Sequence, residues 1–115
     1  MMMRYLPMTL ALIVLMAMTA LAVENKGAEI VLLDGGKRGR VTFHHHLHQN
    51  ILKECQLCHE IFPQEKDAIQ RLKSEGRLAK KQVMNKLCIK CHKALAREGK
   101  PSGPKTCKKC HHKEK

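Results

Sequence analysis

The stretches CQLCH at residues 55–59, CIKCH at 88–92 and CKKCH at 107–111 repeat one pattern, in which two cysteines are separated by two residues and followed by a histidine. This CxxCH pattern is typical of covalent haem attachment, because two thiols can add to the two vinyl groups of one haem while the adjacent histidine binds its iron. The three copies use all six cysteines, so the sequence predicts three c-type haems. The expected binding residues are Cys55, Cys58 and His59; Cys88, Cys91 and His92; and Cys107, Cys110 and His111.

Two other kinds of structure also use paired cysteines. Two CxxC units can close one tetrahedral zinc site, and six cysteines in an exported chain can form a disulfide framework. However, three pairs do not divide into sites of four cysteines, and neither alternative explains why a histidine follows every second cysteine. Haem attachment is therefore the preferred interpretation.

The first 22 residues have the pattern of a secretory signal peptide. An apolar run covers residues 8–22, and Ala20 and Ala22 place small side chains at the two positions that a signal peptidase reads. An uncleaved membrane anchor is the alternative, but the run is short for a full span and lacks flanking stop-transfer charges. We expect cleavage after Ala22, a mature three-haem domain of residues 23–115, and a periplasmic location, since bacteria attach haem covalently outside the cytoplasmic membrane.

The mature chain has few residues from which to build an ordinary core. It contains no tryptophan and no tyrosine after cleavage, and its only large aromatic side chains are Phe43 and Phe62. Domains of this size normally need cross-links or metals for stability. We expect the three haems, held by thioether bonds and axial ligands, to supply the missing apolar surface.

Charge limits the choice of partners. Because Arg4 leaves with the signal peptide, 21 of the 22 basic residues remain against 10 acidic ones, a net charge of +11. Haem propionates would reduce this to about +8 in the ferric state and about +5 in the ferrous state. Nucleic-acid binding is not expected, because the lysines are spread along the chain and aromatic side chains to stack bases are lacking. A basic rim instead favours transient docking on acidic redox partners. We expect a monomer with no stable membrane insertion.

The mature chain is predicted to begin with a β-hairpin. Residues 29–33 and 40–43 have the composition of short strands, and the sequence Asp34-Gly35-Gly36-Lys37 between them is typical of a turn. Residues 23–28 are expected to form a flexible lead-in.

A histidine cluster follows the hairpin directly, and its members are His44, His45, His46 and His48. An iron bound by a CxxCH histidine has a sixth position to fill, and histidine is the commonest ligand there in multihaem electron carriers. We expect at least two of the four to bind iron. The alternative is a solvated or surface metal-binding stretch.

Helices are predicted between the first and third motifs. One is expected from Pro63 to Gly76 and a second over residues 78–87, where apolar side chains recur at helical spacing. A short helical piece after His92 should end at Arg97, before a loop rich in glycine and proline that leads to the third motif.

This order of features resembles the three-haem class III cytochromes c, called the c7 type, which are related to the tetrahaem c3 cytochromes. The resemblance covers nearly the whole mature chain. It implies a small multihaem cytochrome fold, in which a two-stranded β-hairpin and a few short α-helices wrap around three haems with little regular secondary structure. It also implies that His45 is the distal ligand of the haem on the first motif and His48 that of the haem on the second. His44 and His46 are then spare.

The chain departs from the family pattern at Met84. Most members carry the distal histidine of the last haem four residues before the second CxxCH, and here that residue is a methionine. A methionine thioether can bind haem iron and raises its reduction potential, because soft sulfur favours ferrous iron. Alternatively Met84 only packs on a helix face, and the ligand is His44, His46 or His112, or the iron is open. We expect Met84 to bind, so that the third haem has the highest potential.

Function follows from the number of ligands. If all three irons have six ligands, no position is free for a substrate, and the chain is an electron carrier without catalytic residues. The resemblance implies a soluble periplasmic shuttle between inner-membrane donors and terminal reductases or outer-membrane conduits in anaerobic respiration, with non-specific reduction of metal ions possible. The alternatives are a haem enzyme or ligand-binding protein with an open third site, and a small subunit of a reductase complex.

Overall fold

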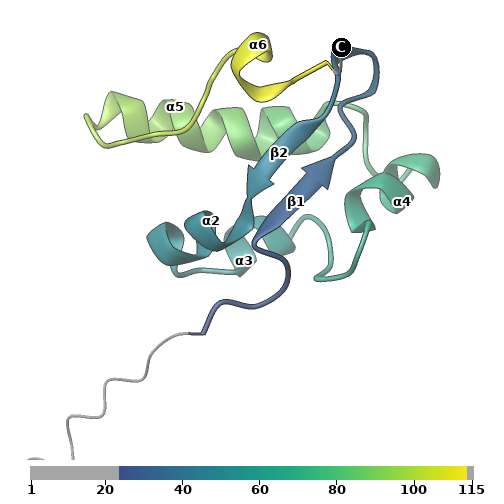
Figure 1. Ribbon diagram of the computed structural model, residues 1–115, viewed down its shortest axis with the longest axis horizontal. Coiled ribbons are helices and arrows are strands. Elements are labelled where there is room, and N and C mark those ends of the chain that lie inside the picture. Colours follow the sequence, from purple (N-terminus) through teal and green to yellow (C-terminus); the bar gives the residue numbers. More distant parts are fainter. Residues whose placement is uncertain (1–23, 114–115) are drawn as a thin grey trace, which may run out of the picture.

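The computed structural model describes residues 24–113 (Figure 1). The predicted signal peptide lies outside the described residues. Two short strands, β1 (Ile30–Leu33) and β2 (Val41–His44), are accompanied by short helical segments. These segments are η1 (Gly36–Arg38), α2 (His45–Leu52), α3 (Gln56–His59), α4 (Ala68–Ser74), η2 (Met84–Cys88), α5 (Ile89–Arg97) and α6 (Cys107–Cys110). Within residues 24–113 no helix is long and apolar enough to cross a membrane.

The predicted hairpin is present. β1 and β2 pair antiparallel, in a register that places Ile30 opposite His44 and Leu33 opposite Val41. The turn begins at Asp34, whose side-chain oxygen accepts a hydrogen bond of 2.7 Å from the backbone N–H of Gly36. Such a bond lets an aspartate side chain stand in for a backbone turn.

The first predicted helix is shorter than expected at its start. Residues 63–67 form turns, and Asp67 has a φ of 56°, which interrupts the helical path so that α4 begins only at Ala68. Its end is as predicted. The N–H of Arg77 donates to the Leu72 carbonyl at 2.9 Å and that of Gly76 to the Lys73 carbonyl at 3.2 Å, which together form a Schellman motif.

The second and third predicted helices are in fact one continuous helix, from Gln82 through η2 and α5 to Arg97. It does not begin at residue 78, because the Gln82 side-chain oxygen accepts the N–H of Ala79 at 3.0 Å, which is half of a capping box. η2 is a π-helical segment inside this helix. The second CxxCH motif therefore lies in mid-helix rather than after a helix end.

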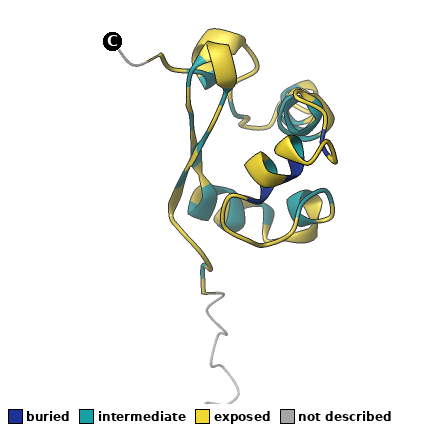
Figure 2. Cartoon of the chain, turned by 90° about the vertical axis from the view of Figure 1, so that its right-hand side faces the viewer, coloured by how far each residue is buried: buried dark blue, intermediate teal, exposed yellow. Residues whose placement is uncertain are grey.

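The protein core is very small. Among the described residues only Ala68, Leu72 and Leu78 are buried, and Figure 2 shows the dark blue confined to α4 and the segment after it. Large apolar side chains on β1, α2 and α3 are exposed, and Ile51 of α2 is 65% exposed. Residues 24–113 therefore do not enclose a conventional hydrophobic core, as the composition suggested.

The hairpin turn lies beside the C-terminal end (Figure 1). Arg40 and His112 form an antiparallel bridge, in which the Arg40 N–H donates to the His112 carbonyl at 3.0 Å and the His112 N–H to the Arg40 carbonyl at 2.8 Å. This bridge holds the third CxxCH motif against the start of the domain.

Candidate haem-binding sites

Each CxxCH motif forms a turn of helix. α3 and α6 coincide with the first and third motifs, and the second lies across η2 and α5. The N–H of His59 donates to the Cys55 carbonyl at 3.0 Å, and that of His111 to the Cys107 carbonyl at 2.8 Å. Residues three apart on a helix lie on one face, so both thiols of each motif face the same side.

Thiols of different motifs raise one another's pKa. Burial raises the pKa of the Cys58 thiol, and interactions with the charges of Cys91 and Cys55 raise it further. Burial also raises the pKa of Cys88, whose thiol interacts with Cys58, Cys110 and Cys91, while a backbone hydrogen bond acts in the opposite direction. The pKa of Cys110 is raised by burial and then by Cys107. Thiols from different motifs therefore lie near one another.

The cysteines of the described chain are all free. All six cysteines lie within the described residues and none is paired in a disulfide. Within residues 24–113, no group of three or more His, Cys, Asp or Glu side chains could hold a metal ion between them. The described residues thus form neither a disulfide nor a cluster of three or more such metal ligands.

The five predicted histidine ligands share one hydrogen-bond arrangement. Each uses its Nδ1 to bond a backbone carbonyl: His45 to Ala28 at 3.0 Å, His48 to His44 at 2.8 Å, His59 to Phe62 at 3.2 Å, His92 to Pro104 at 2.7 Å and His111 to Gly39 at 3.1 Å. A carbonyl can only accept, so Nδ1 carries the proton and the Nε2 lone pair is left available. This is the tautomer that a metal-binding histidine normally adopts.

Two pairs of these rings face each other. The ring centres of His45 and His59 are 6.3 Å apart at an angle of 80°, and those of His48 and His92 are 6.2 Å apart at 34°. A bond from a metal ion to an imidazole nitrogen is about 2 Å long and the ring centre lies about 1 Å behind that nitrogen, so two imidazoles on opposite sides of one ion have centres about 6 Å apart. Both pairs have about this separation, as do the neighbouring rings of His45 and His46 at 6.1 Å.

The two phenylalanines pack against these histidines. Phe43 lies 4.4 Å from the His48 ring, between centres, and Phe62 lies 5.3 Å from that of His59 in an edge-on arrangement. Phe43 is on β2 and His48 on α2, so this contact fixes the angle at which the helix leaves the hairpin.

The other histidines differ from the five. His46 uses Nε2 rather than Nδ1, in a hydrogen bond of 2.9 Å with the Gly27 carbonyl, so its Nε2 is already occupied. His112 pairs through its backbone with Arg40. The side chain of His44 makes no hydrogen bond within the described chain.

Met84 begins η2 and is half-buried. The N–H of Ile89 donates to its carbonyl, the five-residue spacing of a π-helix. Short π-helical segments occur often at functional sites. Within residues 24–113, no hydrogen bond involves the Met84 thioether, and no ring or hydrogen-bond contact joins Met84 to His111.

Two glycines allow backbone to approach the histidine rings, and the sequence reasoning missed both. A Cβ at Gly103 would lie 2.4 Å from Cε1 of His92, and one at Gly35 would lie 2.3 Å from Nδ1 of His111. Both distances are too short for any side chain. The glycines stand in segments that read only as turn or loop, so their contacts with rings distant in sequence left no pattern to detect.

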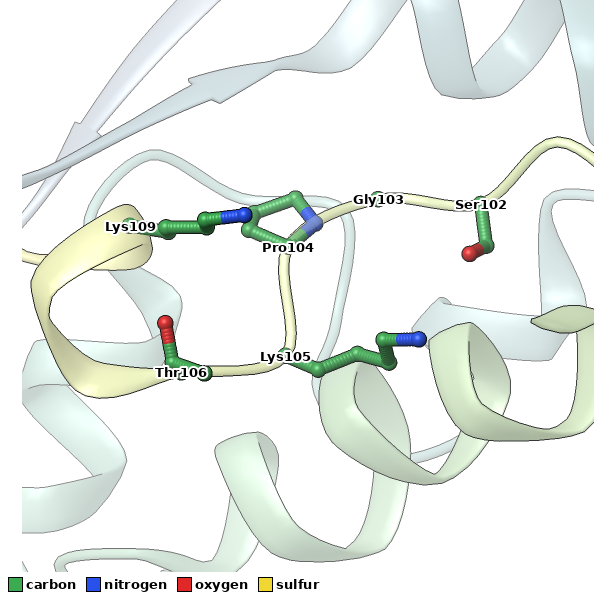
Figure 3. A pocket seen from close by; sticks show the side chains of 6 residues that line it. All are labelled: Ser102, Gly103, Pro104, Lys105, Thr106 and Lys109. Carbon is green, nitrogen blue, oxygen red and sulfur yellow. The ribbon is translucent and has the colours of Figure 1, made fainter.

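The loop between the second and third motifs also frames a shallow hollow of about 370 Å³ (Figure 3). Its lining residues are Ser102, Gly103, Pro104, Lys105, Thr106 and Lys109. It contains two lysines and no acidic residue, so its electrostatic potential favours negatively charged groups.

Comparisons with known proteins indicate the family. The chain is 32% identical over 91 residues to a 26-kDa cytochrome c3 of Desulfomicrobium norvegicum, covering 65% of this chain and 79% of that protein. Its structure is similar to that of the triheme cytochrome PpcA from Geobacter sulfurreducens, with 31% identity, a TM-score of 0.53, and coverage of 75% of this chain and 100% of that one. PpcC, a cytochrome c7 of the same organism, has 28% identity and a TM-score of 0.53, with 76% and 100% covered. No family model matches the chain.

The fold and the three motifs thus define a small multihaem c-type cytochrome, an electron carrier. More particularly, the chain belongs to the triheme class III cytochromes c, with three covalently bound haem c groups. The predicted fold class and cofactor are confirmed.

Proposed function

We propose that this chain is a periplasmic shuttle that accepts electrons from inner-membrane donors and delivers them to terminal reductases or outer-membrane conduits in anaerobic respiration. Membership of the triheme cytochromes supports the electron-carrying part of this proposal. The signal-peptide pattern of residues 1–22 supports export, which haem attachment requires.

The cysteines of each motif attach one haem, and its histidine binds the iron. His45 is the second ligand on the haem of His59, and His48 on the haem of His92. The two preformed ring pairs carry this assignment, because each has the separation of two imidazoles on one ion and each ring has its Nε2 available. His46 is not assigned as a ligand, since its Nε2 is bonded to a carbonyl.

For the third haem, bound through His111, we propose Met84 as the second ligand. Two observations support it. First, three other histidines are described: His44, His46 and His112. None of them bonds a backbone carbonyl through Nδ1, as the five assigned histidines do. Met84 also stands at the start of a π-helical segment, a feature associated with functional positions.

Bound haem supplies a reversible one-electron couple at its iron. The protein's own contribution is to set the potential. When the Nδ1–H of an imidazole donates a hydrogen bond to a carbonyl, the Nε2 that binds iron becomes more basic. A more basic ligand stabilises ferric iron. The two haems with two such histidines should therefore have low potentials. The haem of His111 and Met84 should have a higher one, because it has one such histidine and a soft thioether that favours ferrous iron.

We also propose that the partners present acidic surfaces. Residues 77–113 contain twelve basic residues and one acidic residue, Glu98, which pairs with Lys100 at 2.6 Å. Residues 24–76 contain eight of each sign. The net positive charge of the described chain thus lies in the half that contains the second and third motifs and the basic hollow. Long-range electrostatic attraction would orient an acidic partner toward this half.

One experiment tests the function directly. The purified holoprotein should contain three haems per chain, show only low-spin ferric iron in its optical spectrum, and take up and release three electrons reversibly. A carrier must do all of this without consuming a substrate. A high-spin haem that binds cyanide or carbon monoxide without displacing a ligand would contradict the shuttle and favour a ligand-binding protein.

Substitution of Gly103 tests whether His92 binds the iron of the second haem. Gly103→Ala should force the His92 ring out of its position, because the new methyl would meet Cε1 at 2.4 Å and Nε2 at 2.6 Å. We expect a high-spin fraction on one haem and a loss of stability of about 1–3 kcal/mol. Ser102→Ala, at an exposed residue of the same loop, is the control. Identical spectra for both variants would contradict the role of His92.

A further inference from the structure

The segment before the hairpin, which was expected to be a flexible lead-in, is joined to α2 by hydrogen bonds. Four successive carbonyls, those of residues 26–29, accept hydrogen bonds from α2. Gln49 Nε2 donates to Lys26 at 2.9 Å, His46 Nε2 to Gly27 at 2.9 Å, His45 Nδ1 to Ala28 at 3.0 Å, and the backbone N–H of His46 to Glu29 at 3.3 Å. We call residues 26–29 the N-terminal clamp.

One of these bonds belongs to a proposed iron ligand. The Ala28 carbonyl fixes the tautomer of His45, and Gly27 lies against the same ring, since a Cβ at Gly27 would be 3.4 Å from Cε1 of His45. Gly27 has a φ of 72°, a conformation that favours glycine. The clamp therefore lies directly on the back of the His45 imidazole.

The side chains of His46 and Gln49 bond the carbonyls of Gly27 and Lys26, which precede Ala28 in the clamp. These bonds join the clamp to α2 through side chains from the first two turns of the helix, 19 and 23 residues away in sequence. Without them, the clamp would be tied to α2 by the His45 bond itself and by one longer backbone bond. On its C-terminal side the clamp continues into β1, where Ile30 pairs with His44. On the N-terminal side of Ala28, the clamp is held by the bonds of His46 and Gln49.

We propose that His46 and Gln49 are positioning residues for the first haem: they hold the N-terminal clamp so that the Ala28 carbonyl accepts a hydrogen bond from the Nδ1–H of His45. This rests on the proposed function in taking His45 as an iron ligand. The consequence is a lower potential for this haem, because the hydrogen bond raises the basicity of the ligand that favours ferric iron.

The test is a haem-by-haem redox titration of the holoprotein, followed by NMR of the haem methyl groups. In His46→Ala the potential of the haem on Cys55 and Cys58 should rise, by an amount equivalent to a change of up to about tenfold in the ferric-to-ferrous ratio, or about 59 mV for a one-electron couple. The other two haems should keep their potentials. Gln49→Ala should shift the same haem in the same direction.

A matched control and a rescue separate positioning from a general loss of structure. His44→Ala removes an adjacent, exposed histidine whose side chain makes no hydrogen bond within the described chain, so the three potentials should not change. His46→Gln keeps a side-chain N–H donor and should restore part of the shift.

Equal shifts at all three haems, or the same shift in His44→Ala and His46→Ala, would overturn the proposal. Such results would leave the shuttle intact, provided that three low-spin haems are still reduced reversibly. Loss of low-spin iron in the unsubstituted protein would instead count against the proposed function itself.

Discussion

Replacing Met84 with histidine is expected to lower the potential of the third haem on the order of 0.1 V, because a nitrogen ligand favours ferric iron more than a thioether does. The ferric spectrum should also lose the weak far-red band that arises from methionine-to-iron charge transfer. The measurement is a spectroelectrochemical titration of the holoprotein beside the unsubstituted chain. The two histidine-paired haems provide internal controls, since their potentials should move far less.

A second substitution at the same position gives an independent result. Met84→Ala leaves no side chain able to bind, so one of the three ferric haems should become high-spin and should bind carbon monoxide when reduced. Met84→Leu keeps the packing volume without the sulfur and should give the same spectrum. If both variants remain fully low-spin and retain the far-red band, Met84 is only a packing residue and another side chain binds the third iron.

Haem-free protein is expected to be largely unfolded. The described chain buries only Ala68, Leu72 and Leu78, and this small core cannot offset the conformational entropy lost when the chain is ordered. In the holoprotein, haem surfaces would cover the apolar side chains that are exposed on β1, α2 and α3. Circular dichroism of a chain with all six cysteines replaced by alanine should show no cooperative thermal transition.

A matched control tests whether the loss of folding is due to the absence of haem rather than to the cysteine substitutions. The unsubstituted mature chain, produced where haem is not attached, should behave like the cysteine-free variant, whereas the holoprotein should unfold cooperatively or remain folded. A cooperative transition in either haem-free sample would mean that the polypeptide alone specifies the fold.

Local patterns allowed much of this protein to be predicted from sequence. A CxxCH motif is contained within five residues, so the cysteines, their histidines and the number of haems follow from the chain directly. The hairpin is similarly local, because Asp34 and the glycines of the turn act on their immediate neighbours. The sequence was less informative at the first helix, which begins late because Asp67 adopts a left-handed conformation.

Tertiary structure decided how the histidines are used. The cluster after the hairpin gives four similar side chains, and nothing local distinguishes His46, which bonds the clamp, from His45 and His48, which face His59 and His92. Their partners are carbonyls and rings far away in the chain, and contacts of this kind leave no periodic pattern. The sequence by itself therefore determined what this cytochrome binds, while only the packing of distant segments determined which histidine rings lie next to one another.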